Sequence, residues 1–204
     1  MKLKLAIVSS ALTLTALVAG AGLAWSPAAP AVAAPAADAF TVDSVHSSVV
    51  FRIKHFNTSY FYGRFNNPTG TFNLDFANPS ASTLQVSVKT ADVDTNNKAR
   101  DEHLSKEEFF SAKEYPTITY TGKTFKKLDD HRMEITGELT MRGQTRPLNA
   151  VIEHTGSGKG RVGEALSGIE TRLVINRSEW GVSALVGPLS DEVTLMIALE
   201  GARK

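Results

Sequence analysis

The feature that most constrains this chain is an alternation of apolar and polar residues with a period of two, which begins near Thr41. Side chains of a β-strand point alternately to its two faces, so this period is typical of strands with one buried face. It predicts about eight strands, at residues 49–55, 65–76, 84–89, 117–121, 133–136, 148–153, 172–176 and 193–199.

Residues that favour turns separate these segments. They are Asn66–Gly70, Asp129-Asp130, Arg142–Gln144 and Gly156–Gly160. Strands with a single buried side belong to antiparallel sheets, and short links between consecutive strands favour an up-and-down barrel or a sandwich. We therefore predict an all-β fold of one of these two kinds.

One charged segment, residues 96–113, interrupts the alternation. Within it, Ser105-Lys106-Glu107-Glu108 has the sequence of a capping box. In this motif the serine side chain caps the start of a helix, and the second glutamate side chain accepts a hydrogen bond from the serine N–H. Tyr115-Pro116 ends the segment. We predict a short helical insert over about residues 96–113, with Phe109 and Phe110 to bury, that closes one end of a barrel.

The N-terminus predicts export. Lys2 and Lys4 precede an uncharged stretch over residues 5–25, and Ala31-Val32-Ala33 follows as an A-x-A cleavage site. An uncleaved anchor is the alternative, because the apolar run is long enough to span a bilayer. The small-residue tract favours cleavage, and with it a periplasmic protein that is not stably inserted in the membrane. The predicted parts are a signal peptide at 1–33, an Ala/Pro-rich linker at 34–40 and one domain at 41–204.

The composition excludes several classes of function. The formal net charge is +1, so the chain has no electrostatic basis for binding nucleic acid. It contains no cysteine, and its five histidines show neither H-x-H nor H-E-x-x-H spacing, so we predict no metal site. No G-x-S-x-G or glycine-rich phosphate loop is present. We therefore predict no catalytic residues and no cofactor.

The inner face of a barrel built from these strands mixes bulky residues with small ones such as Gly70, Gly122 and Ala150. Bulky inward residues on every strand fill a small barrel, whereas small or polar ones leave room for a ligand. The alternation alone leaves both possibilities open. A filled barrel indicates a structural or partner-binding envelope protein, and a hollow one indicates a container for an apolar molecule.

Five stretches carry more specific residues. They are DSVHSSVVFRIKH at 43–55, YGRF at 62–65 with Gly70, RDEHL to YPTI at 100–118, GELTMRG at 137–143 with Pro147, and NRSEWGV at 176–182. Together they resemble the YceI family of bacterial periplasmic proteins over about residues 40–200. The family usually has phenylalanine where Trp180 stands, and the wider side chain would change the tunnel length or the choice of ligand.

The resemblance implies an eight-stranded, lipocalin-like antiparallel barrel without catalytic activity, and a homodimer is possible. The family's interior tunnel holds the tail of an isoprenoid quinone, a polyprenyl compound or a fatty amide. Burying an isoprene unit of roughly 100 Å² contributes about 2.5 kcal/mol, so several units outweigh the entropic cost of binding. The expected function is to transport, store or sense a long apolar lipid in the periplasm.

The expected ligand contacts form an apolar and a polar group. The predicted tunnel wall consists of Phe51, Ile53, Phe65, Phe109, Phe110, Leu139, Met141, Leu173, Ile175 and Trp180. Ordinary core packing is the alternative for each of them.

The expected polar contacts, which would select a lipid head group, are His55, Arg100, His103 and Arg177. The alternative for His55 is a hydrogen-bonded core histidine, and for Arg100 and His103 it is a solvated helix face. Arg177 either contacts a phosphate or pairs with an acid to fix a bend. His46 is assigned to stabilising a turn.

Overall fold

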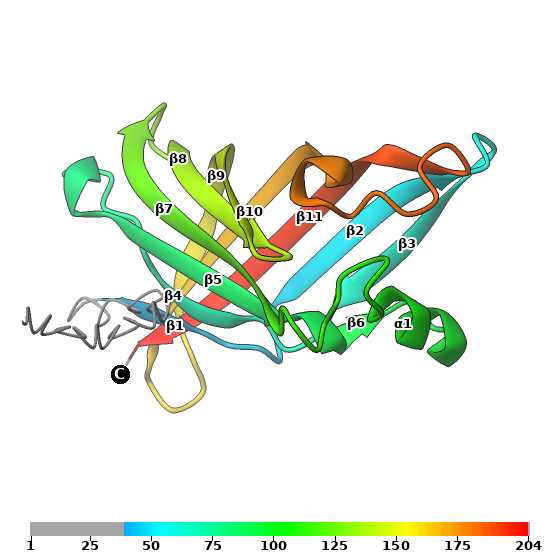
Figure 1. Ribbon diagram of the computed structural model, residues 1–204. Helices are drawn as coiled ribbons and strands as arrows, with labels where there is room; N and C mark the ends of the chain where they lie inside the picture. Colours follow the sequence, from blue (N-terminus) through cyan, green and yellow to red (C-terminus); the bar gives the residue numbers. More distant parts are fainter. Residues whose placement is uncertain (1–38, 204) are drawn as a thin grey trace, which may run out of the picture. The chain divides into compact units, whose positions relative to one another are not determined.

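The computed structural model describes residues 39–203, which form one antiparallel sheet of eleven strands with a short α-helix (Figure 1). The strands are β1 (Phe40–Val42), β2 (Ser48–His55), β3 (Ser59–Phe65), β4 (Thr69–Asn73), β5 (Thr83–Lys89), β6 (Val93–Asp94), β7 (Thr117–Lys127), β8 (Arg132–Met141), β9 (Gln144–Lys159), β10 (Ala165–Asn176) and β11 (Leu189–Arg203). The helices are α1 (Lys98–Leu104) and the 3-10 helices η1 (Pro79–Ala81), η2 (Thr90–Asp92) and η3 (Arg177–Trp180).

The predicted signal peptide and most of the predicted linker lie outside the described residues. Among residues 39–203, no helix has the length and apolar character needed to cross a membrane.

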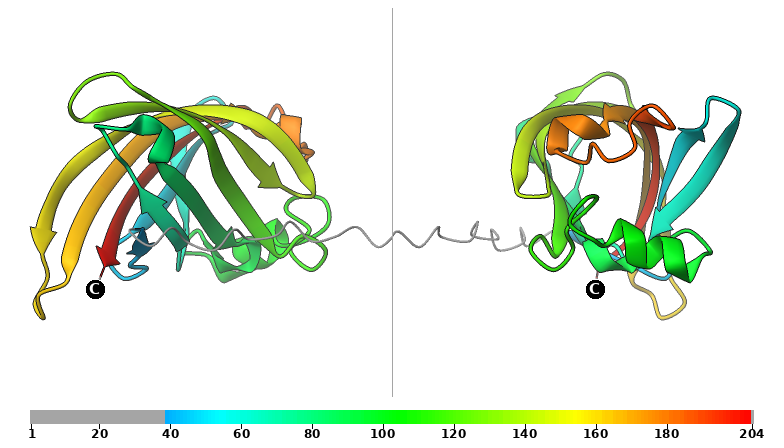
Figure 2. Two further views of the ribbon diagram at one scale, coloured as in Figure 1. Left: turned by 90° about the vertical axis from the view of Figure 1, so that its left-hand side faces the viewer. Right: turned by 45° about the vertical axis from the view of Figure 1, so that its right-hand side comes forward.

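Eight of the strands close into a barrel. They pair in the order β1-β4-β5-β7-β8-β9-β10-β11, and a further pairing of β11 with β1 completes the ring. The ring is visible end-on in the right-hand view of Figure 2. Every pairing between these strands is antiparallel. The all-β fold and the eight-stranded antiparallel barrel expected from the sequence are confirmed.

The remaining strands, β2, β3 and β6, extend the barrel wall at one end. They can do so because β11 is fifteen residues long and pairs along one edge with both β1 and β2. Near its end, Gly201 and Ala202 pair with β1, whereas residues 193–198 pair with β2. β2 then pairs with β3, and β3 with β6. The strand predicted at 49–55 is therefore β2, which lies in this extension and not in the ring. The short β1, which the alternation did not predict, closes the ring.

Strands β7 to β11 are each longer than predicted, and two further differences change the course of the chain. The stretch predicted at 65–76 is divided between β3 and β4, because Asn67 adopts a positive φ of 53° that turns the chain. The turn predicted at Gly156–Gly160 is also wrong. β9 continues to Lys159, and Gly156 lies at a bulge opposite Gly168, where its φ of 155° suits glycine.

The capping-box prediction is wrong as well. Asn97 caps α1, since its side chain accepts a hydrogen bond from the Arg100 N–H. Ser105 lies at the C-terminal end of α1, where its hydroxyl donates to the Asp101 carbonyl oxygen. The helix therefore ends where the capping box predicted its start. Residues 106–114 fold as turns, which bury Phe109 and bring Phe110 against Phe65 with the rings 5.5 Å apart.

Candidate functional site

Two apolar cavities adjoin, one inside the barrel ring and one beside the extension that β2 and β3 form. The inner cavity, of about 130 Å³, lies among the inward side chains of β5 and β7 to β11. The outer cavity, of about 380 Å³, lies between the β2–β3 hairpin, α1 with the turns after it, and the 181–189 segment. The two share four wall residues, Phe65, Met141, Ile175 and Leu195. An apolar molecule could therefore extend from one cavity into the other.

The inner cavity is apolar because the alternation of each strand turns aliphatic side chains inward. Along β8, for example, Leu139 and Met141 line it, while Glu138 and Thr140 point to the other face. The Tyr120 hydroxyl also faces this region and donates to the Leu148 carbonyl oxygen at 3.1 Å. Burial raises the pKa of Tyr120 to about 12, so this phenol is uncharged at neutral pH.

Arg100 is held at the wall of the outer cavity. Its Nε donates to Thr95 Oγ1 at 2.8 Å, and its Nη2 donates to the Thr95 carbonyl oxygen at 2.7 Å. The guanidinium also lies over the Phe61 ring, 4.2 Å from the centroid. These contacts orient a cation beside an apolar space, as recognition of a polar head group requires.

The two histidines of the outer cavity differ in surroundings. His103 is hydrogen bonded to Glu108 and stands edge-on to Phe109, with the ring centroids 5.0 Å apart. His55 ends β2 and is exposed, with its ring edge-on to Phe56. The alternative of a core position for His55 is therefore wrong, because the strand ends at the mouth of the outer cavity.

Arg177 is buried, with 5% of its surface exposed, and fixes the bend after η3. Its Nη1 donates to the carbonyl oxygens of Val182 and Ala184 at 2.8 Å, and its Nε donates to that of Ser190 at 3.0 Å. Burial lowers the pKa of the guanidinium from its usual value. Arg177 thus holds the bend through backbone carbonyls and not through a direct ion pair, while the Asp191 carboxylate accepts hydrogen bonds from the Ser178 N–H and hydroxyl at the same bend. Arg177 also lines the outer cavity.

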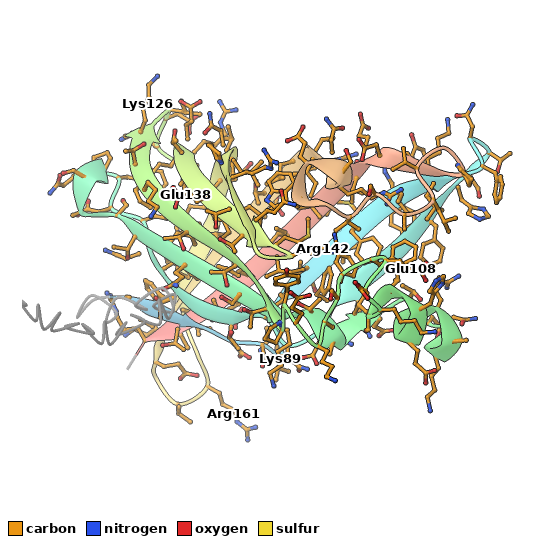
Figure 3. The ribbon with its side chains drawn as sticks, viewed as in Figure 1. Lys89, Glu108, Lys126, Glu138, Arg142 and Arg161 are labelled. Atoms are coloured by element: carbon orange, nitrogen blue, oxygen red, sulfur yellow. The ribbon has the colours of Figure 1, made fainter. Side chains whose placement is uncertain are left out.

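Arg142, in the β8–β9 turn, joins two walls of the outer cavity and was not among the predicted residues. Its Nη1 donates to the Gly181 carbonyl oxygen at 2.6 Å and its Nη2 to that of Glu107 at 2.7 Å. Figure 3 shows it between the β8–β9 turn and the segment that carries Glu108. Only the folded chain brings these three segments together.

Trp180 lies outside both cavities. It is 2% exposed and packs behind the wall, with its Nε1 bonded to the Leu139 carbonyl oxygen. The other predicted residues do line a cavity: Phe51, Ile53, His55, Phe65, Arg100, His103, Phe109, Phe110, Met141, Ile175 and Arg177 the outer one, and Phe65, Leu139, Met141, Leu173 and Ile175 the inner one. Their contact with a ligand stays a prediction.

Sequence reasoning missed part of the outer wall, namely Tyr60, Phe61, Val182, Leu185 and Leu189. The aromatic run at 60–62 signals β3, but its aromatic side chains point to both faces, so no clear alternation marks it. The residues after η3 belong to an irregular segment, where no period predicts the direction of a side chain.

His46 has the predicted role in a turn. Its Nδ1 lies 2.7 Å from Asp43 Oδ2, and this hydrogen bond raises the pKa of the imidazole. Asp43, His46 and Glu200 form the one group of potential metal ligands found among residues 39–203, with ligand atoms within 4.8 Å of one another. The His46 side chain is exposed, and the hydrogen bond to Asp43 accounts for its position.

Comparison with known proteins decides the family. A family model described as a YceI-like domain matches residues 40–201. This chain belongs to the YceI family. A UPF0312 protein of Pectobacterium carotovorum is 37% identical to it over 165 residues, which cover 81% of this chain and 85% of the relative. Protein YceI of Escherichia coli O157:H7 is 36% identical over 159 residues, or 78% of this chain and 83% of the relative. The resemblance inferred from the five stretches is confirmed.

Solved structures share the barrel of this YceI-family chain. The Campylobacter jejuni YCEI protein has a TM-score of 0.66 and 34% identity, with 74% of this chain and 90% of that one covered. Burkholderia cenocepacia BcnA has a TM-score of 0.72 at 21% identity, with coverages of 78% and 99%. A polyisoprenoid binding domain from Saccharophagus degradans has a TM-score of 0.63 at 14% identity, with coverages of 80% and 98%. The last two likenesses show the fold alone.

Proposed function

We propose that this protein binds the tail of a long isoprenoid or acyl lipid in the two adjoining cavities, as a periplasmic carrier, store or sensor and not as an enzyme. One observation carries the proposal: apolar walls continue from the mouth of the outer cavity into the inner one, through Phe65, Met141, Ile175 and Leu195. A long apolar chain gains about 25 cal/mol for each Å² that such walls remove from water.

The positively charged groups of this site lie at one end, as a lipid with a single anionic or polar head group requires. Arg100 and His103 line the outer cavity, whereas the inner cavity is walled mainly by aliphatic side chains. The head group then sits near Arg100, and the tail points toward Ala150 and Ile152. The fold shared with the S. degradans polyisoprenoid binding domain also supports an isoprenoid tail.

The direct test is organic extraction of the protein, purified from its own host, followed by mass spectrometry of the extract. We expect an isoprenoid or acyl lipid in near-stoichiometric amount. A clean extract, together with no uptake of an added long-chain isoprenoid quinone, would show that the barrel is not a lipid container.

A cavity-filling variant makes the test specific. Ala150 is 5% exposed and lines the inner cavity, so Ala150→Phe should occupy the space meant for the end of the tail. We expect this variant to retain shorter lipids and lose longer ones. Ala198→Phe is the matched control, because Ala198 is exposed on β11 and outside both cavities. An unchanged lipid profile for Ala150→Phe would contradict the proposed tail position.

A further inference from the structure

Large exposed apolar side chains gather at the mouth of the outer cavity. Among residues 39–203, the three exposed aromatic side chains all lie on the β2–β3 hairpin: Phe56 is 62% exposed, Tyr60 52% and Tyr62 53%. Leu185 and Val186, in the segment between η3 and β11, are 54% and 48% exposed. Neighbouring exposed apolar side chains of this kind mark a binding surface more often than scattered ones do.

The hairpin and the segment lie side by side. The Phe56 N–H donates to the Pro188 carbonyl oxygen at 2.6 Å, and Leu189 pairs with His55. Both elements lie at the same end of the barrel extension in Figure 1. Tyr60 and Leu185 also line the outer cavity. The exposed side chains therefore form a lip around its mouth, which we define as Phe56, Tyr60, Leu185 and Val186.

Two of the lip residues occupy a backbone conformation that their side chains disfavour. Phe56 has a φ of 45° and Leu185 a φ of 56°, both in the left-handed region. A bulky residue in this region costs stability that a buried side chain recovers through packing. Phe56 and Leu185 are more than half exposed, so packing within the chain offsets only part of this cost. Strain at exposed apolar positions indicates a role in binding.

The two elements that form the lip carry a net positive charge. Residues 44–74 and 181–190 contain no aspartate or glutamate, whereas the hairpin carries Arg52 and Lys54. Both cations lie over the Tyr60 ring, at 4.0 and 5.9 Å from its centroid. Aromatic side chains flanked by arginine and lysine are typical of surfaces that rest in the head-group region of a bilayer.

We propose that the lip docks on the surface of an anionic lipid bilayer, so that an apolar tail passes between the bilayer and the outer cavity without crossing water. The transfer rests on the proposed function, but docking needs no lipid in the cavity. Charge complementarity favours a bilayer over a second copy of this chain, because a symmetric contact through the lip would bring Arg52 and Lys54 of both copies together.

Vesicle sedimentation tests the docking. The purified exported protein is mixed with vesicles of phosphatidylcholine alone, or of phosphatidylcholine with phosphatidylglycerol, none of which contain isoprenoid lipid. We expect binding to the anionic vesicles that weakens as salt is added. Lys54→Gln should reduce the preference for phosphatidylglycerol.

Phe56→Asn is the decisive variant, because Phe56 belongs to the lip but lines neither cavity. Asparagine tolerates the left-handed region, so the substitution relieves strain while it removes exposed apolar area, and stability should be unchanged or higher. We expect it to weaken vesicle binding by about tenfold, the equivalent of withdrawing one large apolar side chain from the bilayer. The matched control is Val162→Asn, because Val162 is 87% exposed in the β9–β10 turn, away from the lip.

Uptake of a long-chain isoprenoid quinone from detergent micelles, without vesicles, separates this proposal from the proposed function. A Phe56→Asn protein that loses vesicle binding but loads normally supports docking. Vesicle binding without loading in the native protein contradicts the lipid-container function and leaves docking supported. A Phe56→Asn protein that binds vesicles as well as the native protein overturns the docking proposal. A dimer that Phe56→Asn abolishes, with no vesicle binding by the native protein, overturns it as well.

Discussion

The indole Nε1 of Trp180 donates a 2.9 Å hydrogen bond to the carbonyl oxygen of Leu139. The two residues lie 41 positions apart in the chain, and the bond ties η3 to β8. The Leu139 side chain lines the inner cavity, while Trp180 packs behind the wall. The indole thus supports the position of the wall without belonging to its surface.

Trp180→Phe should lower the free energy of unfolding by about 1–3 kcal/mol, because it removes this hydrogen bond and leaves a small void. Urea unfolding measures the change. Trp180 is the only tryptophan outside the predicted signal peptide. Its emission maximum should therefore stay constant when the protein takes up an acyl lipid that does not absorb light. A saturable shift would show that a ligand reaches the indole.

Arg177→Met should lower the free energy of unfolding by about 3 kcal/mol or more, since several backbone carbonyls lose a charged donor. The 181–189 segment should also become a site of limited proteolysis. Arg161→Met is the control, because Arg161 is exposed in the β9–β10 turn. Equal stability of the two variants would contradict the role assigned to Arg177.

Gly63→Ala should narrow the outer cavity. Gly63 pairs with Phe51 across the β2–β3 ladder, and an added Cβ at Gly63 would lie 2.3 Å from Cζ of Phe51. The Phe51 ring would therefore have to shift. Phe51 lines the outer cavity, so we expect weaker lipid uptake and a stability loss of about 1–3 kcal/mol from overpacking. Gly158→Ala, which meets nothing within 4 Å, should leave lipid uptake unchanged.

The high pKa of Tyr120 predicts a loss of stability in alkali. An unfolded tyrosine ionises near pH 10, whereas burial raises the pKa of Tyr120 to about 12 in the folded protein. The unfolded state therefore releases its proton first. The stability that depends on neutral Tyr120 is complete below pH 10 and is lost as the pH rises toward 12. Unfolding of Tyr120→Phe should show a weaker dependence on pH across this window. An identical pH profile would contradict the assignment.

Local patterns predicted the faces of the strands well, because the period of two depends only on neighbouring residues. Leu139 and Met141 on β8, and Leu173 and Ile175 on β10, all line a cavity as the alternation predicts. For Arg100 the sequence left a head-group contact and a solvated helix face open, and the structure places it at the wall of the outer cavity. Helix capping was less reliable, since both Asn97 and Ser105 are competent cap residues and only one begins α1.

The sequence by itself determined the all-β class, the inward and outward faces of most strands, and the family. The tertiary structure decided which strands close the ring, because β11 pairs with β1 near Gly201 and with β2 near Ile197. It also decided that the barrel has cavities, that Trp180 lies behind the wall, and that Phe56 stands at the mouth. These features depend on pairings between residues far apart in the chain, which no local period encodes.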